Sequence, residues 1–204
     1  MTAPDWRTLV VEYIRREAQP PDKFGHQPRL YALATKIALA EGLAFDDDIL
    51  FAAAWMHDLG VFLGHRPNDL VALARWDHVP YTVARTRELL AGWGFPAQKI
   101  DGVAAAIGAH QPNDKPKEIE AVLLRDADIL EQLGVIGALR AFVKVGRDTR
   151  YQSFSSVFTM LNRLLRELPS ELHLNQSKLL SGERVKSLRD FLAAIESEAG
   201  DLLF

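Results

Sequence analysis

The chain has 204 residues, carries a formal net charge of −3 and contains no cysteine. The length suits one domain with a sizeable core. The slight acidic balance argues against a broad surface for a nucleic-acid polymer, and the lack of cysteine excludes disulfides and thiolate metal sites. Since no apolar run approaches the roughly 20 residues that span a bilayer, and the first residues lack the layout of a signal peptide, we expect a cytoplasmic protein without a membrane partner.

Helical periodicity dominates the first part of the chain. From Leu30 to Ala38 the apolar residues keep the i, i+3, i+4, i+7 spacing of one helical face. Asp46–Asp48 supply an N-cap and first-turn acids for a nearly all-apolar helix through about Met56. We expect this helix at the centre of the fold, with Gly60 ending it, and a loop or broken helix over 61–75.

The rest of the chain continues in the same way, and strand alternation is hard to find. Further helices are expected at about 76–91, 96–108 and 118–133, then up to about 145, and at 154–168 and 183–198. Polar loops at 110–116 and 146–150 separate them. The pattern predicts an all-α single domain over 1–204, with a core at about 22–146 and a C-terminal helical extension at about 150–204.

The most informative residues are a histidine–aspartate doublet and further metal-binding side chains spread over separate stretches. The full set is His26, His57, Asp58, His78, His110 and Asp128. A doublet at the end of an apolar helix is costly unless something pairs with it, and a metal ion is the most economical explanation. Adjacent helical residues diverge by about 100°, so the doublet can share an ion only near a helix terminus or in a broad pocket. The competing interpretation is a hydrogen-bonded core network without metal.

The order His, His-Asp, Asp resembles the HD-domain superfamily of metal-dependent phosphohydrolases, in particular its small single-domain bacterial members. The similarity covers roughly 25–145. Gly25–Leu30 is similar to the opening His-x-x-Arg stretch of the family, Ala53–Gly60 to its signature doublet, and Asp126–Gly137 to the segment of the last ligand. The resemblance implies a helical fold with a metal site between its central helices.

By that resemblance, one ion is held by His26, His57, Asp58 and Asp128. Asp126 is a rival to Asp128, or lies behind it as a supporting partner. In two-metal members, histidines placed like His78 and His110 hold a second ion, whereas in one-metal members they contact the substrate or a leaving group. Ligands of nitrogen and oxygen without sulfur suit Mn, Fe, Co, Ni, Zn or Mg.

Three basic residues are candidates for contact with a phosphate. Arg29 lies one helical turn after His26 and shares its face. Arg66, next to His65, follows the doublet in a segment that we interpret as an exposed polar loop, and Lys115 stands in the loop after the 96–108 helix. Each of these charges is also compatible with simple solvation.

The sequence departs from the family pattern at two places. Some nucleotide-directed members carry an acid shortly after the doublet, where this chain continues Gly60–Leu63, and related hydrolases often have an arginine at the position of Ile129. The general acid or base is therefore open between Asp77, His78 and His110.

We expect a phosphohydrolase in which a bound divalent ion lowers the pKa of its water and polarises a phosphoryl oxygen. The catalytic candidates are Asp58, His78, His110 and Arg29, and the substrate is a phosphorylated small molecule, with nucleotides as the leading class. The alternatives are a di-iron oxygenase or cyanamide-hydratase-like enzyme on the same fold, a nucleotide-sensing module without turnover, and a structural domain. A homodimer stays open because the C-terminal helices are apolar enough to pair.

Overall fold

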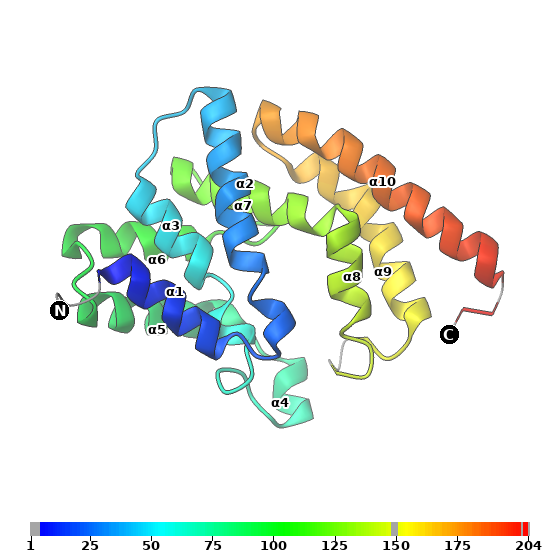
Figure 1. Cartoon of the computed structure of the whole chain (residues 1–204), viewed down its shortest axis with the longest axis horizontal. Helices are drawn as coiled ribbons and strands as arrows, with labels where there is room; N and C mark the ends of the chain where they lie inside the picture. The colour runs from blue at the N-terminus through cyan, green and yellow to red at the C-terminus, as the bar shows by residue number, and fades with distance from the viewer. Residues whose placement is uncertain (1–4, 148–150, 201, 204) are drawn as a thin grey trace. The chain divides into compact units, whose positions relative to one another are not determined.

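The computed structural model describes residues 5–147, 151–200 and 202–203, and over these ranges it contains helices and no strand (Figure 1). The all-α prediction is therefore confirmed. The chain forms two compact units, Met1–Arg125 and Asp126–Phe204, and the boundary falls inside helix α7 (Ile119–Gln132). The single-domain division with a core at 22–146 stays a prediction.

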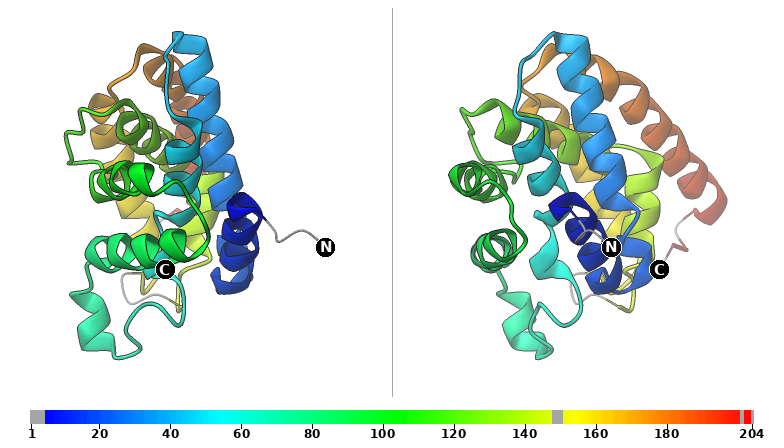
Figure 2. Two further views of the ribbon diagram at one scale, coloured as in Figure 1. Left: turned by 90° about the vertical axis from the view of Figure 1, so that its left-hand side faces the viewer. Right: turned by 60° about the vertical axis from the view of Figure 1, so that its left-hand side comes forward.

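The first unit is built around α3. Its elements are α1 (Trp6–Glu17), η1 (Pro21–Lys23), α2 (His26–Glu41), α3 (Asp47–Met56), η2 (Leu59–Val61), α4 (Leu70–Ala74), α5 (His78–Gly92), η3 (Ala97–Lys99) and α6 (Ile100–Gly108). Helices α1, α2 and α6 pack against α3, and α5 packs against α6 (Figure 2). The expected helices at 76–91, 96–108 and 118–133 are confirmed with small shifts at their ends.

Helix α3 has the predicted bounds, but the residue predicted to end it does not do so. The Asp46 side chain caps it by accepting from the backbone N–H groups of Asp48 and Ile49, and every side chain from 50 to 56 is buried. The helix ends at Met56, as expected, but the expected role of Gly60 is wrong. Gly60 does not adopt the left-handed conformation of a glycine cap, and it lies in the following turn η2.

Helix α1 was not expected from the sequence. Asp5 caps it by accepting from the Thr8 N–H, and its apolar face packs on α3 through Trp6, whose ring meets the edge of Phe51 at 5.6 Å. Trp6 also meets Phe95 at 4.8 Å. The contact with Phe51 holds α1 on the central helix, and the contact with Phe95 holds it on the segment between α5 and η3.

A charged network surrounds the N-terminal end of α3. Arg7 donates to Asp47 at 2.8 Å and to Asp48 at 2.6 Å, and Lys99 bonds Asp46 and Asp48, each at 2.8 Å. The network joins α1 and η3 to the first turn of α3, whose other end carries the doublet.

The second unit contains α8 (Val135–Phe142), α9 (Phe154–Glu167), η4 (Leu168–Glu171) and α10 (Asn175–Ala199). The three α-helices pack on one another (Figure 1) around Ala138, Ala141, Val157, Leu161, Leu188 and Leu192. Helix α10 begins eight residues before the expected 183, and α8 ends before the expected 145. Part of the expected loop at 146–150 lies outside the described residues.

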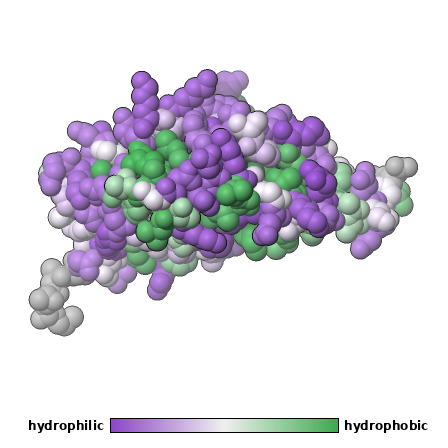
Figure 3. Space-filling model, turned by 90° about the horizontal axis from the view of Figure 1, so that it is seen from above, coloured by the Kyte–Doolittle hydropathy of each residue, from purple (hydrophilic) through white to green (hydrophobic). Residues whose placement is uncertain are grey.

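No helix in the described part of the chain is both long and apolar enough to cross a bilayer. The face seen from above is mainly hydrophilic, and apolar residues gather there in small patches (Figure 3).

Candidate metal centre

Five of the six candidate ligands lie at helix ends within the first unit. His26 opens α2, His57 is the C-cap of α3, Asp58 precedes η2, His78 opens α5, and His110 follows α6. The helix terminus required for the doublet is thus present. At a terminus the backbone turns sharply, so neighbouring side chains can face one point rather than diverge by about 100°.

The first cluster consists of His26, His57 and Asp58. One ligand atom from each lies within 4.8 Å of the other two. Asp58 Oδ2 is 3.9 Å from His26 Nε2 and 3.6 Å from His57 Nε2. The side chains of both histidines are almost fully buried, at 2% and 0% exposed.

The second cluster consists of Asp58, His78 and His110, again with one ligand atom of each within 4.8 Å of the others. Here the other oxygen of the carboxylate, Asp58 Oδ1, is 3.7 Å from His78 Nε2. The side chains of Asp58 and His78 are 21% and 19% exposed, although the His78 Nε2 atom itself is buried. Asp58 therefore stands between two groups of imidazoles and turns one oxygen to each.

Backbone carbonyls orient two of the imidazoles. His57 Nδ1 is 3.0 Å from the Ala54 carbonyl oxygen, and His110 Nδ1 is 2.6 Å from the Ile107 carbonyl oxygen. Since a carbonyl can only accept, Nδ1 carries the proton in both rings and Nε2 carries the lone pair in the neutral form. This is the arrangement in which metal-binding histidines are commonly held.

The charge of Asp58 is strongly favoured. Burial by itself raises its pKa, but the imidazoles of His57, His26, His78 and His110 together hold the pKa well below the usual value of 3.8. The centre thus keeps a carboxylate in a histidine-rich surrounding, the donor set of a divalent cation of intermediate hardness.

The loop after His110 is fixed by a residue that the sequence analysis overlooked. Arg125 of α7 is 1% exposed and donates to the carbonyls of Gln111 and Pro112. Asp114 accepts from the Gln111 N–H at 2.8 Å. Burying this cation requires such partners, but the sequence does not show that this arginine of a helical stretch is buried.

The basic candidates occupy less enclosed positions. Arg29 is exposed, and its guanidinium lies against Gly25 at the start of α2, where an added Cβ would come within 2.9 Å of it. Arg66 is partly buried, and Lys115 is exposed in the loop after His110.

His65 does not belong to an exposed loop, and that expectation is wrong. Its side chain is 8% exposed. The ring lies 2.8 Å from the Tyr81 hydroxyl through Nδ1 and 3.1 Å from Glu17 through Nε2. It therefore links α1 to α5 and serves the packing of the unit rather than covering the centre.

The second unit distinguishes the two aspartates of α7. The Asp126 side chain is fully buried and accepts from the backbone N–H groups of His173, at 3.1 Å, and Leu174, at 2.9 Å. Asp128 accepts from Gln132 Nε2 at 3.1 Å. Residues two apart on a helix point in nearly opposite directions, so Asp126 is committed to the segment before α10 while Asp128 occupies the other face.

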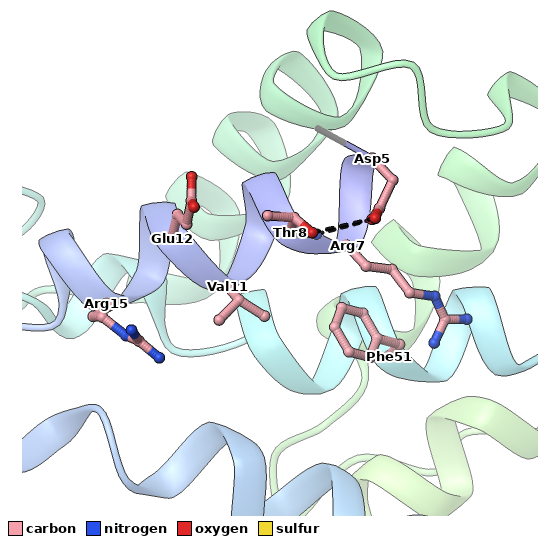
Figure 4. Close-up of a pocket in the computed structure, with 7 residues that line it drawn as sticks. All are labelled: Asp5, Arg7, Thr8, Val11, Glu12, Arg15 and Phe51. Atoms are coloured by element: carbon pink, nitrogen blue, oxygen red, sulfur yellow. Dashed lines mark hydrogen bonds between the residues drawn. The ribbon is translucent and has the colours of Figure 1, made fainter. Parts of the chain in front are cut away.

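A separate pocket of about 550 Å³ lies on α1 and contains none of the candidate ligands (Figure 4). It is lined by six residues between Asp5 and Arg15 and by Phe51. Arg7 points toward Phe51 and lies 4.7 Å from the ring centroid. Its guanidinium is already ion-paired with the carboxylates of Asp47 and Asp48.

An all-helical unit with a carboxylate shared by two histidine groups defines a candidate metal-binding protein. The chain belongs to the HD-domain family, whose model matches residues 24–133. Both the suspected family and the HD-type fold class are thereby confirmed. Membership supports a metal-dependent hydrolase that binds a divalent cation.

Solved structures of similar fold cover nearly the whole chain. Bacillus subtilis YpgQ in complex with ADP is 22% identical, covers 96% of this chain and 99% of its own, and has a TM-score of 0.69. An HD-superfamily hydrolase from Bacillus thuringiensis is 19% identical with 95% and 94% covered and a TM-score of 0.65. A predicted HD-superfamily hydrolase from an uncultured Thermotogales bacterium is 20% identical with 95% and 92% covered and a TM-score of 0.63. No curated protein matches the sequence.

Proposed function

We propose that this protein is a metal-dependent phosphohydrolase that acts on a phosphorylated small molecule, with nucleotides as the leading substrate class. The observation that carries the proposal is the pair of three-residue clusters that share Asp58. A cation bound there would supply a Lewis acid for the phosphoryl oxygens and lower the pKa of water.

The first ion is assigned to His26, His57 and Asp58, with Asp128 as the fourth ligand. The donor set fits because His57 presents Nε2 and Asp58 stays ionised. Asp128 is preferred to Asp126 because the carboxylate of Asp126 is already bonded to backbone N–H groups of the segment before α10.

The second cluster is assigned to a second ion. Asp58 would be a ligand in both clusters, since its two oxygens face different imidazoles. In the one-ion alternative, His78 and His110 contact the substrate instead. His78 is the more accessible of the two, and in that case it donates a proton to the leaving oxygen, since imidazole titrates near neutral pH.

The basic residues complete the proposed substrate site. Arg29 offsets phosphate charge from the start of α2, where the helix dipole also favours an anion, and Arg66 and Lys115 bind more distant phosphate oxygens. A nucleotide is favoured because a protein of the same fold, B. subtilis YpgQ, forms a complex with ADP. The net charge of −3 disfavours a nucleic-acid polymer.

The test is release of phosphate or pyrophosphate from a panel of nucleotides and simple phosphate esters after loading with Mn²⁺. We expect product from the wild type, none from His57→Ala, and wild-type product from His173→Ala, which removes an imidazole that is 41% exposed and belongs to neither cluster. Failure to bind metal after reconstitution contradicts the proposal.

A second candidate function deserves a parallel assay because a shared carboxylate between two histidine groups also suits a di-iron centre. Iron at two per chain with oxygen uptake would identify an oxygenase, and hydration of cyanamide would identify a hydratase. Either activity without phosphate release would overturn the phosphohydrolase.

A further inference from the structure

The turn after the doublet lies unusually close to the first turn of α5. A Cβ added to Gly60 would come within 2.8 Å of the His78 carbonyl oxygen and 2.9 Å of Thr82 Oγ1. No real Cβ atom tolerates such contacts with a backbone atom. Glycine at this position therefore allows the helix that carries His78 to approach the turn that follows Asp58.

One hydroxyl connects the two elements. Thr82 is fully buried, and its Oγ1 accepts from the Gly60 N–H at 3.0 Å and donates to the His78 carbonyl at 2.8 Å. The hydroxyl thus donates to one backbone segment and accepts from the other, and these segments carry His78 and Asp58 of the second cluster.

A second bond holds Gly60 from the other side. Trp76 Nε1 donates to the Gly60 carbonyl at 2.8 Å. Residues on both sides of His78 in the sequence, Trp76 before it and Thr82 after it, are therefore bonded to one residue, Gly60, two positions beyond Asp58. Of the two side chains, only that of Thr82 also bonds to His78 itself, at its carbonyl.

The two ligand atoms that these segments carry, Asp58 Oδ1 and His78 Nε2, lie 3.7 Å apart. Both side chains are partly exposed, so packing alone does not lock their distance. Groups that orient metal ligands from behind change metal affinity by about 10–100-fold.

We propose that Thr82 is a positioning residue that builds the second cation subsite, Asp58, His78 and His110, by clamping α5 to Gly60. The inference rests on the proposed function, because it requires that this cluster holds an ion. Thr82 itself touches neither the ion nor the substrate.

The test is equilibrium dialysis of the full-length protein with Co²⁺, with thermal unfolding of each variant measured alongside. Thr82→Val keeps the shape and removes the hydroxyl, and Thr82→Ser keeps the hydroxyl. Thr86→Val is the matched control, since Thr86 lies one turn later on α5, is 1% exposed, and its hydroxyl has no hydrogen-bond partner among the described residues. We expect Thr82→Val to weaken the second ion by about tenfold or more, with the first ion unchanged and both other variants like wild type.

The outcomes separate this inference from the proposed function. His78→Ala should bind one ion where the wild type binds two. If it does, and Thr82→Val keeps the second ion at wild-type affinity, the role of Thr82 is refuted while the centre stands. If the wild type binds a single ion, the second subsite and the inference both fail. If Thr82→Val does not fold, the test uses Trp76→Phe, which removes the other bond to Gly60. The proposal then requires that this variant binds the second ion more weakly than the wild type.

Discussion

Asp58 is the residue on which both clusters depend, because each of its oxygens faces different imidazoles. We predict that Asp58→Asn loses bound metal and turnover, since a neutral amide cannot bridge two cations. Asp190→Asn removes the same charge from an exposed position on α10, and it should leave metal content and turnover unchanged. Metal content by elemental analysis and phosphate release are the two readouts. Retention of metal and full turnover in Asp58→Asn would remove this residue from the centre.

Asp126 and Asp128 should respond differently to the same substitution. Asp126→Asn replaces a buried acceptor of backbone N–H groups and should lower the free energy of unfolding by about 1–3 kcal/mol. Asp128→Asn should instead weaken metal binding with little loss of stability. Urea unfolding and metal titration distinguish the two, and the reverse pattern would exchange their roles.

At this scale the sequence supplied the residue types but not their partners. The doublet, its helix terminus and the other histidines could be predicted because a His-Asp pair at the end of an apolar helix is costly unless it has a partner. Thr82 and Arg125 could not, since their importance lies in bonds to backbone atoms of distant segments. A hydroxyl or a guanidinium carries no pattern that announces such a bond.

At the scale of elements, the approach of α5 to the doublet turn is the feature that most constrains the centre. Gly60→Ala places a methyl group against the His78 carbonyl, so α5 must shift. We predict a loss of about 1–3 kcal/mol in stability from overpacking, together with weaker binding of the second ion. Gly92→Ala, where an added Cβ meets nothing within 4 Å, is the control, and it should be neutral or stabilise by up to about 1 kcal/mol. Equal behaviour of the two variants would show that the contact is unimportant.

The charged network at the start of α3 should give a pH-dependent stability. Burial raises the pKa of Asp46 and the bond from Lys99 lowers it, with a net decrease; bonds from Lys99 and Arg7 also lower the pKa of Asp48. Carboxyls with depressed folded pKa values stabilise above the unfolded value of about 3.9, and this contribution is lost as the pH falls through the folded values. Lys99→Met should therefore lower the melting temperature at pH 7, with a gap to wild type that shrinks below about pH 4.

Lys36→Met is the control for this measurement, because Lys36 is exposed on α2. It should melt like the wild type at both pH values. A gap between Lys99→Met and the wild type that stays constant from neutral to acid pH would mean that the ion pairs do not contribute.

Two helical segments that the sequence analysis did not predict differ in whether a pattern was present. Helix α1 was open to prediction, since Trp6, Val10 and Ile14 recur at helical spacing after the capping Asp5. The first two turns of α10 were not, because Ser177 and Ser181 occupy its buried face and Gly182 follows them. Small polar residues on a packed face leave no hydrophobic periodicity.

At the scale of the whole molecule, helical periodicity predicted the all-α class and the family order of ligands predicted the centre. The division into Met1–Arg125 and Asp126–Phe204 was not foreseen, because the boundary falls within a continuous helix. A sequence pattern reports the helix and not the units that it joins. Five of the six candidate metal ligands nevertheless lie in the first unit.

The most direct test of the account is a crystal of the protein grown with Mn²⁺ and measured for anomalous scattering. We predict an anomalous peak within about 2.0–2.3 Å of His57 Nε2 and an oxygen of Asp58, and a second peak between Asp58, His78 and His110. A protein that is saturated with Mn²⁺ in solution but shows its only ions away from Asp58 would contradict the central claim.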